Sequence, residues 1–315
     1  MLTVGQETHT YTWIDNWVTI PDTDSGKRNG RTHGVICTDS GKIVIFNQAD
    51  PGILVYNKQG ELLNAWGDRF SGAHGITYVN ENNHEYIWLA DENSGEVCKT
   101  DLDGKIVACI ERPPHSVYAE GTAYIPTSVA VFEERFGGNG DIWVADGYGS
   151  SLVHHFDKFG NYLNSITGAE GPSGKFACPH GLAIRYDKAE PELYIADRAN
   201  ERIQVYDLFC NHIRTIPEIT HSPCSFTFHE GCTYIPELFT GIKILDPDDN
   251  LIASIGDNDG ITTAPGWPNM AGTDYIQPGK FNSPHDLTVD QEGNIYIVEW
   301  IIGGRITKLE KQQTI

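Results

Sequence analysis

A unit of four short, strand-like runs recurs along this chain at intervals of 41 to 60 residues. One copy, within residues 180–218, reads HGLAIRY, ELYIADR, RIQVYDL and HIRTIPE. The runs are rich in Val, Ile and Tyr, and Gly, Asp and Asn punctuate the turns between them. Such short, regularly spaced runs are typical of antiparallel strands joined by tight turns. The repeat therefore predicts an all-β fold built from copies of one four-stranded sheet.

The last copy of the unit is incomplete, with only the runs HDLTVDQ, NIYIVEW and RITKLEK before the chain ends. The run TYTWIDN, residues 10–16, has no partner in the first unit and can supply the missing strand. Radial packing of such sheets around a channel protects their edges. We predict a single domain, residues 1–315, folded as a six-bladed β-propeller closed by its N-terminal strand, with no helix of consequence. The blades are expected to begin near His33, His74, Ser128, His180, Ser225 and His285.

Histidines open four of these units, in the contexts RTHGVI, GAHGIT, CPHGLA and SPHDLT. The first strand of each blade lines the channel, so equivalent positions face each other across the axis. His74, His180 and His285 open the second, fourth and sixth blades, which lie about 120° apart in such a ring. Three imidazoles that converge on one point are a ligand set for zinc, with a fourth position left for water or substrate. We predict a zinc site at these residues, with His33 beside it and in contact with substrate.

The alternative is that the histidines reflect inheritance of the repeat alone, with each ring capping a turn. His154 and His155 in LVHHFD alternate between the two faces of a predicted strand, and we expect them to pack or face solvent rather than bind metal.

The composition limits the partners of the chain. The net charge is −21, and the 22 Lys and Arg residues are scattered, which argues against nucleic acid or an anionic membrane as a partner. There is no run of 18 apolar residues, and the N-terminus lacks the features of a signal peptide. The seven cysteines include no CxxC pair, and we expect reduced, buried thiols in a cytoplasmic protein that acts on a small molecule.

The stretches GDIWVADGYGSSLVHHFDKFGNYL, FACPHGLAIRY and LYIADRANERIQVYD resemble the catalytic core of peptidyl-α-hydroxyglycine α-amidating lyase, within the broader group of NHL-repeat propellers. HGVICTDSGKIVIF in the first predicted blade and PHDLTVDQEGNIYI in the last extend the similarity over most of the chain. The resemblance implies a zinc-dependent lyase that splits an α-hydroxyglycine end into an amide and glyoxylate.

The resemblance also implies where the metals bind. The zinc ligands of the family match His74, His180 and His285. A structural calcium of the family would use the backbone carbonyls of Val35 and Ile76 and the carboxylate of Asp286. A site of hard oxygen ligands beside a site of nitrogen ligands is chemically coherent.

Three further residues acquire roles from the resemblance. Tyr148, in the DGY motif, matches the catalytic tyrosine, and a dication nearby would stabilise its phenolate. Arg198, in ADR, matches an arginine that pairs with a carboxylate or an oxyanion, and Gln48 stands where a second family arginine is expected. The alternatives are an aromatic ring stacked on a turn for Tyr148 and a turn salt bridge with Asp197 for Arg198.

A long segment, residues 257–281, leads directly into His285 and carries Trp267 beside two prolines. Long irregular loops in compact domains are often functional. We therefore predict that this loop covers the channel mouth as a lid, and that Trp267 contacts substrate.

Three functions remain open at this point. The first is a lyase of this type that acts on a small hydroxylated polar metabolite or an α-hydroxyglycine-like compound, because Gln48 cannot neutralise a carboxylate and the disulfide cysteines of the family are absent. The second is a metal-dependent hydrolase or isomerase of a lactone or sugar derivative, for which the expected carboxylates at the channel mouth are few. The third is a non-catalytic NHL scaffold that binds protein. The carboxylates that end second strands are Asp146, Asp197, Glu237 and Glu299.

Overall fold

The computed structural model of the protein describes residues 1–217 and 220–312. Within these residues the strands form six antiparallel sheets. The chain divides into two compact units, which we call the terminal unit (Met1–Arg69 and Cys224–Ile315) and the middle unit (Phe70–Pro223). Each unit contains three of the sheets, and each is described by itself.

The sheets of the middle unit are simple meanders in which each strand pairs with the next one along the chain. They comprise β7 (Ala73–Glu81), β8 (His84–Asp91), β9 (Glu96–Asp101) and β10 (Ile106–Ile110); β11 (Ser128–Val131), β12 (Ile142–Asp146), β13 (Leu152–Phe156) and β14 (Tyr162–Ile166); and β15 (Pro179–Arg185), β16 (Glu192–Asp197), β17 (Arg202–Asp207) and β18 (His212–Pro217).

Two sheets of the terminal unit are also meanders, and the third joins both ends of the chain. The meanders comprise β3 (Thr32–Cys37), β4 (Ile43–Asn47), β5 (Ile53–Tyr56) and β6 (Leu62–Trp66); and β19 (Thr227–His229), β20 (Cys232–Pro236), β21 (Ile242–Leu245) and β22 (Leu251–Ile255). This third sheet has five strands in the order β23 (Pro284–Val289), β24 (Ile295–Glu299), β25 (Arg305–Lys311), β2 (His9–Val18) and β1 (Leu2–Gln6).

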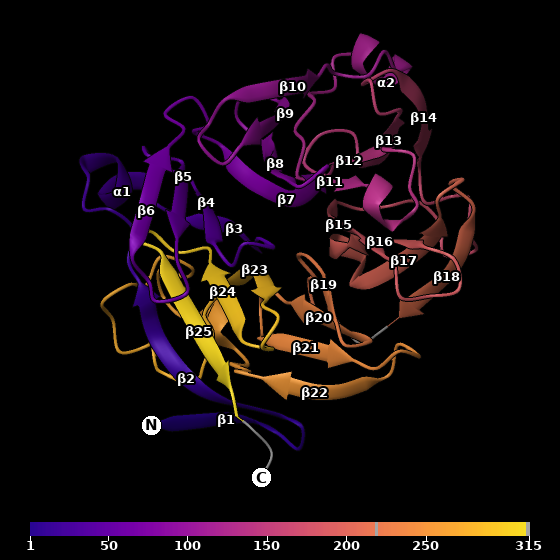
Figure 1. Cartoon of the computed structure of the whole chain (residues 1–315). Helices are drawn as coiled ribbons and strands as arrows, with labels where there is room; N and C mark the ends of the chain where they lie inside the picture. The colour runs from indigo at the N-terminus through magenta and orange to yellow at the C-terminus, as the bar shows by residue number, and fades with distance from the viewer. Residues whose placement is uncertain (218–219, 313–315) are drawn as a thin grey trace. The chain divides into compact units, whose positions relative to one another are not determined.

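The predicted fold class, an all-β six-bladed propeller, is confirmed, and every first strand begins within two residues of its predicted start. Figure 1 shows the indigo strand β2 beside the yellow strand β25, and Trp13 pairs with Leu309 in this ladder. The N-terminal strand therefore completes the last blade, as predicted. Strand β1, which adds a fifth strand to the edge of that sheet, was not expected. The prediction of a single domain stays a prediction.

Burial explains the apolar runs of the repeat. Every residue of the second strands β4, β12 and β24 is buried, because both faces of these strands pack against side chains. Strands buried on two faces are read as nearly continuous hydrophobic runs. The fourth strands β6 and β10 are mostly exposed. Hydrophobic clusters join neighbouring sheets within each unit, for example Trp88 and Ala90 of β8 with Ile142 and Val144 of β12.

The turns between third and fourth strands follow one pattern. In the turn after β13, the Asp157 carboxylate accepts hydrogen bonds from the amides of Phe159 and Asn161, both at 2.9 Å. Gly160 follows with φ of 81°, a left-handed conformation that glycine adopts without strain. In the matching turn after β17 this position is Cys210, with φ of 67°. The Asp and Gly residues between the strand-like runs of the sequence are therefore explained by the geometry of these turns.

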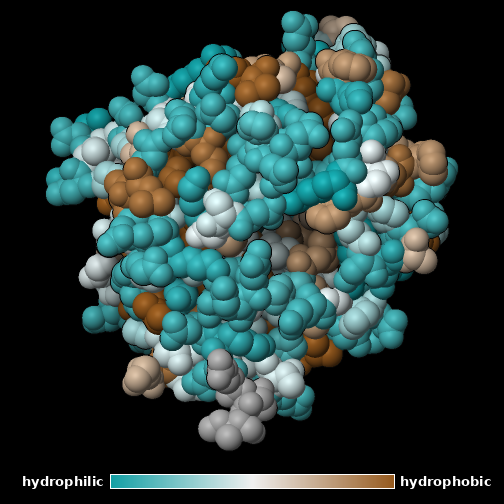
Figure 2. Space-filling view, in the orientation of Figure 1, coloured by the Kyte–Doolittle hydropathy of each residue, from teal (hydrophilic) through white to brown (hydrophobic). Residues whose placement is uncertain are grey.

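Helices are short in the described part of the chain, as predicted. They are α1 (Asp24–Asn29), α2 (Ser116–Ala119) and the 3-10 helices η1 (Glu134–Phe136), η2 (Arg198–Asn200) and η3 (Ile261–Thr263). None of the helices in residues 1–217 and 220–312 has the length and hydrophobicity needed to cross a bilayer. Figure 2 shows a mostly hydrophilic face with hydrophobic residues in small separate groups.

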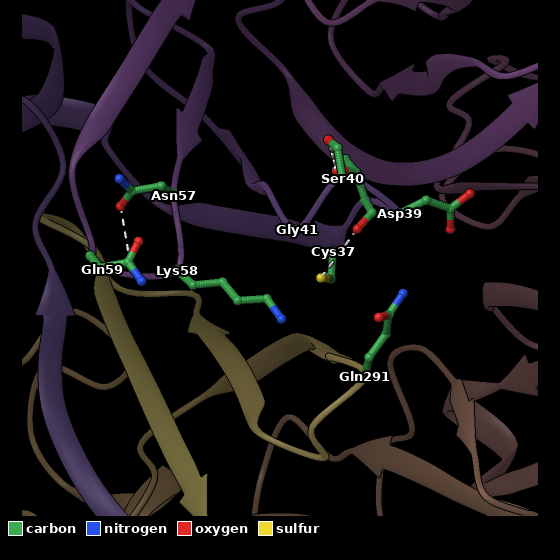
Figure 3. Close-up of a pocket in the computed structure, with 9 residues that line it drawn as sticks. Cys37, Asp39, Ser40, Gly41, Asn57, Lys58, Gln59 and Gln291 are labelled. Atoms are coloured by element: carbon green, nitrogen blue, oxygen red, sulfur yellow. Dashed lines mark hydrogen bonds between the residues drawn. The ribbon is translucent and has the colours of Figure 1, made fainter.

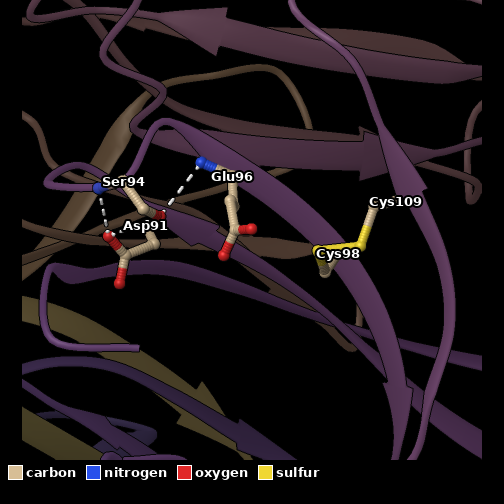
Figure 4. The surroundings of a disulfide bond; sticks show 5 residues. All are labelled: Asp91, Ser94, Glu96, Cys98 and Cys109. Atoms are coloured by element: carbon tan, nitrogen blue, oxygen red, sulfur yellow. Dashed lines mark hydrogen bonds between the residues drawn. A yellow bond between two sulfur atoms is a disulfide. The ribbon is translucent and has the colours of Figure 1, made fainter. Parts of the chain in front are cut away.

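The expectation that the cysteines are reduced is wrong for two of them. Cys98 in β9 and Cys109 in β10 form a disulfide (Figure 4). They are direct partners in the strand ladder, with Cα atoms 4.1 Å apart, so the sheet itself brings the two thiols together. The remaining five cysteines form no disulfide: Cys37, Cys178, Cys210, Cys224 and Cys232. Disulfides are typical of oxidising compartments, and the cytoplasmic location stays a prediction.

Candidate active site

The middle unit brings His74, Tyr148, His180 and Arg198 together. His74 lies at the start of β7 and His180 at the start of β15, both almost fully buried. The centroids of their rings are 4.6 Å apart. The Tyr148 hydroxyl lies 3.1 Å from His74 Nε2 and 3.2 Å from His180 Nε2. The sequence therefore located four residues that do form one cluster.

Arg198 contacts the same phenol. Its Nη2 donates a hydrogen bond of 3.2 Å to the Tyr148 hydroxyl, and its guanidinium lies 5.2 Å from the centre of the Tyr148 ring. Asp197, the partner in the alternative reading of Arg198, forms an ion pair with Arg202 at 2.6 Å. The phenol oxygen thus accepts from a cation, while its own proton can be donated to an imidazole.

Backbone packing fixes the orientation of His74. Its Nδ1 lies 2.6 Å from the carbonyl oxygen of Thr127, which can only accept, so Nδ1 carries the proton. Nε2, which faces Tyr148, is then the unprotonated nitrogen. Burial lowers the pKa of His74 to about 3, so the ring is neutral at pH 7. Histidine binds metals as a neutral imidazole, through the unprotonated nitrogen, while the N–H of the other nitrogen is typically held by an acceptor such as a carbonyl.

The glycines of the motifs allow this close packing. A Cβ on Gly75 would lie 2.5 Å from the carbonyl oxygen of Thr127. A Cβ on Gly147 would lie 2.4 Å from the carbonyl oxygen of Pro179, and one on Gly149 would lie 2.2 Å from a carboxylate oxygen of Asp146. The HG and DGYG patterns therefore report backbone contacts that place the functional side chains.

The Tyr148 side chain is 37% exposed, although its hydroxyl faces the two imidazoles. Desolvation of the hydroxyl raises the pKa of this phenol, and the charge of Arg198 opposes that shift. The phenol is consequently protonated at neutral pH. A second cation close to the oxygen would favour the phenolate, which is the form that can accept a proton.

The terminal unit contains His33 and His285. His285 lies in β23, and its Nδ1 donates to the carbonyl oxygen of His33 at 2.8 Å. The two rings are 4.5 Å apart between centroids. This bond leaves Nε2 of His285 as the unprotonated nitrogen, as in His74. His33 therefore lies beside His285, and the zinc site and the substrate contact of His33 stay predictions.

Asp286 is half-buried and contacts Val35, one of the residues in the calcium prediction. The contact, however, is with the amide of Val35, which donates to Oδ2 at 2.9 Å, whereas the prediction concerned the carbonyl. Oδ1 accepts from the Ser225 hydroxyl at 2.5 Å and the Leu287 amide at 2.9 Å. Burial raises the pKa of Asp286 to about 7. Ile76 lies in β7 of the middle unit, paired with Leu89, and the calcium site stays a prediction.

The carboxylates that end second strands hold the loops that precede the first strands of their own sheets. Each of the following residues is completely buried. Asp146 accepts from the Ile125 amide at 2.6 Å, Asp197 from the Ala177 amide at 2.7 Å, and Glu299 from the Asn282 amide at 2.5 Å. In the second sheet Asp91 accepts from the Gly72 amide at 2.8 Å and from its own turn, seen in Figure 4. In the fifth sheet Glu237 accepts from the Thr240 hydroxyl.

Gln48 and Trp267 lie in the terminal unit. The Gln48 amide donates to the carbonyl oxygen of Arg31 at 2.8 Å, immediately before β3. Trp267 is anchored by its Nε1, which donates to the carbonyl oxygen of Asn282 at 3.0 Å, and its ring lies 6.4 Å from that of Trp300. Sequence reasoning did not identify Arg31 or Trp300. Their positions could have indicated them, because both residues lie next to strand ends at which site residues were expected.

The terminal unit also has a cavity of about 360 Å³ at the turns after β3, β5 and β23 (Figure 3). Lys58 and Gln291 extend toward each other in it, and Cys37 lies at its wall. Cys37 is the last residue of β3, whereas His33 is near its start, roughly 13 Å along an extended strand. This cavity is therefore separate from the histidines.

The sequence of the chain is similar to those of known proteins. The chain is 29% identical over 209 residues to the probable peptidyl-alpha-hydroxyglycine alpha-amidating lyase pgal-1 of Caenorhabditis elegans, covering 57% of this chain and 56% of that protein. It is 30% identical over 179 residues to human NHL repeat-containing protein 3, covering 53% and 49%. The predicted resemblance is confirmed. The chain spans about half the length of these curated relatives, and no family model matches it.

Solved structures of low sequence identity share the fold. A streptogramin B lyase matches with a TM-score of 0.61 at 12% identity, covering 95% of this chain and 98% of that one. A gluconolactonase from Xanthomonas campestris matches with a TM-score of 0.60 at 13% identity, covering 90% and 88%. These likenesses support the architecture alone, and the chemistry has to be argued from the residues.

Proposed function

We propose that the protein is a metal-dependent lyase of the peptidyl-α-hydroxyglycine α-amidating type, acting on a small hydroxylated polar metabolite or an α-hydroxyglycine-like compound. One observation carries the proposal: the Tyr148 hydroxyl is within 3.2 Å of Nε2 of both His74 and His180 and of Nη2 of Arg198. A phenol between two metal-binding groups and a cation is placed for proton transfer. The name of the lyase relative pgal-1 supports the same reaction class.

His74, His180 and His285 are the proposed zinc ligands. The donor chemistry fits, because Nδ1 of His74 and Nδ1 of His285 each bond a carbonyl, which leaves Nε2 as the ligand atom in both rings. When bound, zinc would supply a Lewis acid that makes a substrate hydroxyl more acidic. The proposed second ion is a structural calcium held by Val35, Ile76 and Asp286.

The residues of the chain divide the remaining work. Tyr148, as phenolate, accepts the proton of the substrate hydroxyl; the carbon–nitrogen bond next to it breaks, and the amide nitrogen leaves with a proton. Arg198 stabilises the phenolate and the carboxylate or oxyanion of the substrate. Gln48 donates hydrogen bonds to further polar groups, and His33 contacts the substrate.

The hydrolase or isomerase alternative needs carboxylates that are free to bind an ion. Asp146, Asp197 and Glu299 instead accept backbone amides of their own loops, which makes them structural groups. Asp91 accepts the Gly72 amide in the same way, and Glu237 accepts from the Thr240 hydroxyl in the turn that follows it. The nitrogen ligand set therefore favours the lyase.

Metal analysis of the purified protein, with the His180→Ala variant, tests the proposal. We expect one zinc per chain in the wild type, release of glyoxylate from an N-acyl-α-hydroxyglycine, and loss of both in the variant. His84→Ala is the matched control, because His84 is exposed at the start of β8 and its loss should leave zinc and turnover unchanged. A His180→Ala protein that is fully active without metal would contradict the proposal.

A further inference from the structure

Three side chains form a line across one sheet of the middle unit. Trp143 in β12 pairs with His155 in β13, and His155 pairs with Asn164 in β14. Residues directly opposite each other on neighbouring strands point to the same face of a sheet. The turn between β17 and β18 of the next sheet brings Cys210 against this face, where it packs on the hydrophobic cluster that contains Trp143. Tertiary structure thus places a thiol beside an imidazole.

The imidazole of His155 connects this thiol to a carboxylate. Cys210 Sγ lies 3.7 Å from His155 Nδ1, and His155 Nε2 lies 3.0 Å from an oxygen of Asp141, which directly precedes β12. Burial lowers the pKa of His155, so the ring is neutral at pH 7. Since a carboxylate only accepts hydrogen bonds, Nε2 carries the proton, and Nδ1, which faces the sulfur, is unprotonated. A thiol, a base and a group that orients the base are the parts of an activated nucleophile.

Trp143 holds the base and offers the sulfur a donor. Its ring is stacked on that of His155, with centroids 4.4 Å apart and planes 5° apart, which fixes the imidazole. The side chain is completely buried, and its Nε1 has no hydrogen-bond partner within the part of the chain that the structure describes. Burial raises the pKa of the Cys210 thiol, and this N–H, which lies close to the sulfur, opposes that shift. A thiolate is a stronger acceptor than a thiol, so ionised sulfur would satisfy the buried donor.

The resting sulfur is nevertheless a thiol. Burial, and after it the carboxylates of Asp207 and Glu170, raise its pKa. Its S–H donates to Oδ1 of Asn164 at 3.5 Å. Reaction therefore needs the base, because the proton has to pass to His155 as the sulfur attacks. The nearby carboxylates disfavour an anionic reagent and favour a small neutral one.

The turn that carries Cys210 has an uncommon backbone for this residue type. Cys210 has φ of 67°, and the same position in the turns after β5, β9 and β13 is Gly60, Gly104 and Gly160. After β21 the position is Asp249, a residue type that adopts this conformation more readily. The cysteine therefore occupies a place where the repeat mostly uses glycine, and such backbone outliers are concentrated at functional sites.

The thiol lies away from the candidate active site. His180 is near the start of β15, and two successive antiparallel pairings make β17 run in the same direction as β15. The turn after β17 is consequently at the opposite end of this sheet from His180. Whatever Cys210 does, it does without touching the cluster around Tyr148.

We propose that Cys210 and His155, oriented by Asp141, form a reactive-thiol site at which a neutral hydroperoxide oxidises Cys210 to a sulfenic acid. The thiol proton passes to His155 Nδ1 as the sulfur attacks the terminal hydroxyl oxygen of the hydroperoxide. The S–O bond forms and the O–O bond breaks, so sulfur loses the two electrons that the peroxide gains. The leaving alkoxide or hydroxide takes the proton from His155 and departs as an alcohol or water. Thiols can reduce the sulfenic acid again, which makes the modification reversible.

Peroxide treatment of the whole chain tests the proposal. Sulfenic acid is trapped with dimedone at timed intervals and located by mass spectrometry of the peptides. Cys37 is the internal comparison, because it is also half-buried, while its thiol donates to the Thr38 carbonyl oxygen. We expect hydrogen peroxide to oxidise Cys210 about 10²-fold faster than Cys37 at pH 7.

Variants separate the base from burial. His155→Gln removes the base and keeps a side chain that can bond Asp141, so Cys210 should then react at the rate of Cys37. Asp141→Asn, which removes the charge that supports the protonated ring, and Trp143→Phe, which removes the N–H and keeps a ring, should each slow the oxidation about tenfold. His84→Gln, at the exposed start of β8, is the matched control and should leave the rate unchanged.

The rates decide the matter without any measurement of turnover, so the inference stands or falls independently of the proposed lyase. Oxidation of Cys210 no faster than that of Cys37, or wild-type oxidation of Cys210 in His155→Gln, would overturn it. If His155→Gln does not fold, Asp141→Asn decides, because Asp141 is only half-buried and its replacement leaves the stacked rings in place. An unchanged rate in that variant would equally overturn the inference.

Discussion

The two units treat a buried histidine in the same way and then surround it with different chemistry. His74 in the middle unit donates its Nδ1 proton to Thr127, which precedes the first strand of the next sheet. His285 in the terminal unit donates its Nδ1 proton to His33, in the first strand of the sheet that follows it in the predicted ring. The repeat thus builds the same imidazole orientation twice.

The surroundings differ. Nε2 of His74 faces the Tyr148 phenol and, beyond it, Arg198. The His285 ring instead lies 4.5 Å from the His33 ring, which in turn lies 6.3 Å from the ring of Trp300. The half-buried Asp286 follows His285 in β23. In the proposed function, the middle unit therefore carries the groups that transfer protons, and the terminal unit carries groups that bind. A repeat can fix the geometry of a ligand residue while its variable turns decide the chemistry.

The largest effect should come from removing the one hydroxyl that distinguishes the middle unit. Tyr148→Phe keeps the ring but removes the acid–base group, so we expect kcat to fall by about 10²–10⁴-fold with the zinc content unchanged. Steady-state kinetics and metal analysis on the same preparation measure both. Tyr275→Phe, at an exposed tyrosine of the terminal unit, is the control. Unchanged kcat in Tyr148→Phe would remove the proposed difference between the units.

The next effect concerns how each unit secures a loop carboxylate. Asp146 accepts a hydrogen bond from the Tyr118 hydroxyl at 2.7 Å, and Tyr118 in turn contacts His154 Nε2 at 2.6 Å. In the terminal unit the matching Glu299 is paired with Arg305 at 3.0 Å, and arginine does not lose its charge. The Asp146 loop of the middle unit should therefore be more acid-sensitive than the Glu299 loop, or than the Asp197 loop of its own unit, which pairs with Arg202.

Burial lowers the pKa of His154 from 6.5 to about 4. The unfolded chain takes up this proton first as the pH falls, so the folded state loses stability between pH 6.5 and about pH 4 and gains it back as the pH rises. The expected loss is about 3 kcal/mol, and His154→Gln should remove it, because glutamine can hydrogen bond but does not titrate. Denaturant unfolding of both proteins from pH 7 to pH 4 measures the difference, with His84→Gln as control. Parallel pH profiles of His154→Gln and the wild type would contradict this reading.

The sequence predicted those parts of the molecule that depend on side chains recurring in each repeat. Strand positions, the N-terminal closing strand and the places of His74 and His180 follow from the spacing of the repeat. Tyr148 and Arg198, which lie beside them, were indicated by the resemblance. Packing of His154 and His155 was also expected, and both are buried.

What the sequence did not predict depends on contacts of the backbone or between distant segments. The carbonyl of Thr127 that orients His74 has no side-chain signature. The stacking of Arg31 on Trp300 joins residues far apart in the chain. The Cys98–Cys109 disulfide was missed because cysteine spacing alone does not reveal that two residues are partners in a strand ladder.

The smallest expected effect sharpens the holding role of the terminal unit. Asp286→Asn keeps one acceptor oxygen but turns an amide NH₂ group toward a backbone N–H, either that of Val35 or that of Leu287. An unsatisfied buried donor costs about 1–3 kcal/mol, and relief of the buried acid offsets part of it, so we expect a loss of about 1–2 kcal/mol. Denaturant unfolding measures this loss, and zinc content should not change.

Calcium gives the same variant a second readout. If Asp286 holds a structural calcium, added Ca²⁺ stabilises the wild type by mass action and has no effect on Asp286→Asn. Asp259→Asn, at an exposed aspartate of the same unit, controls for the loss of one negative charge and should respond to Ca²⁺ like the wild type. Equal stabilisation of Asp286→Asn and the wild type would show that this carboxylate holds only the backbone, and the proposed contrast between a reactive and a binding unit would then lose its structural ion.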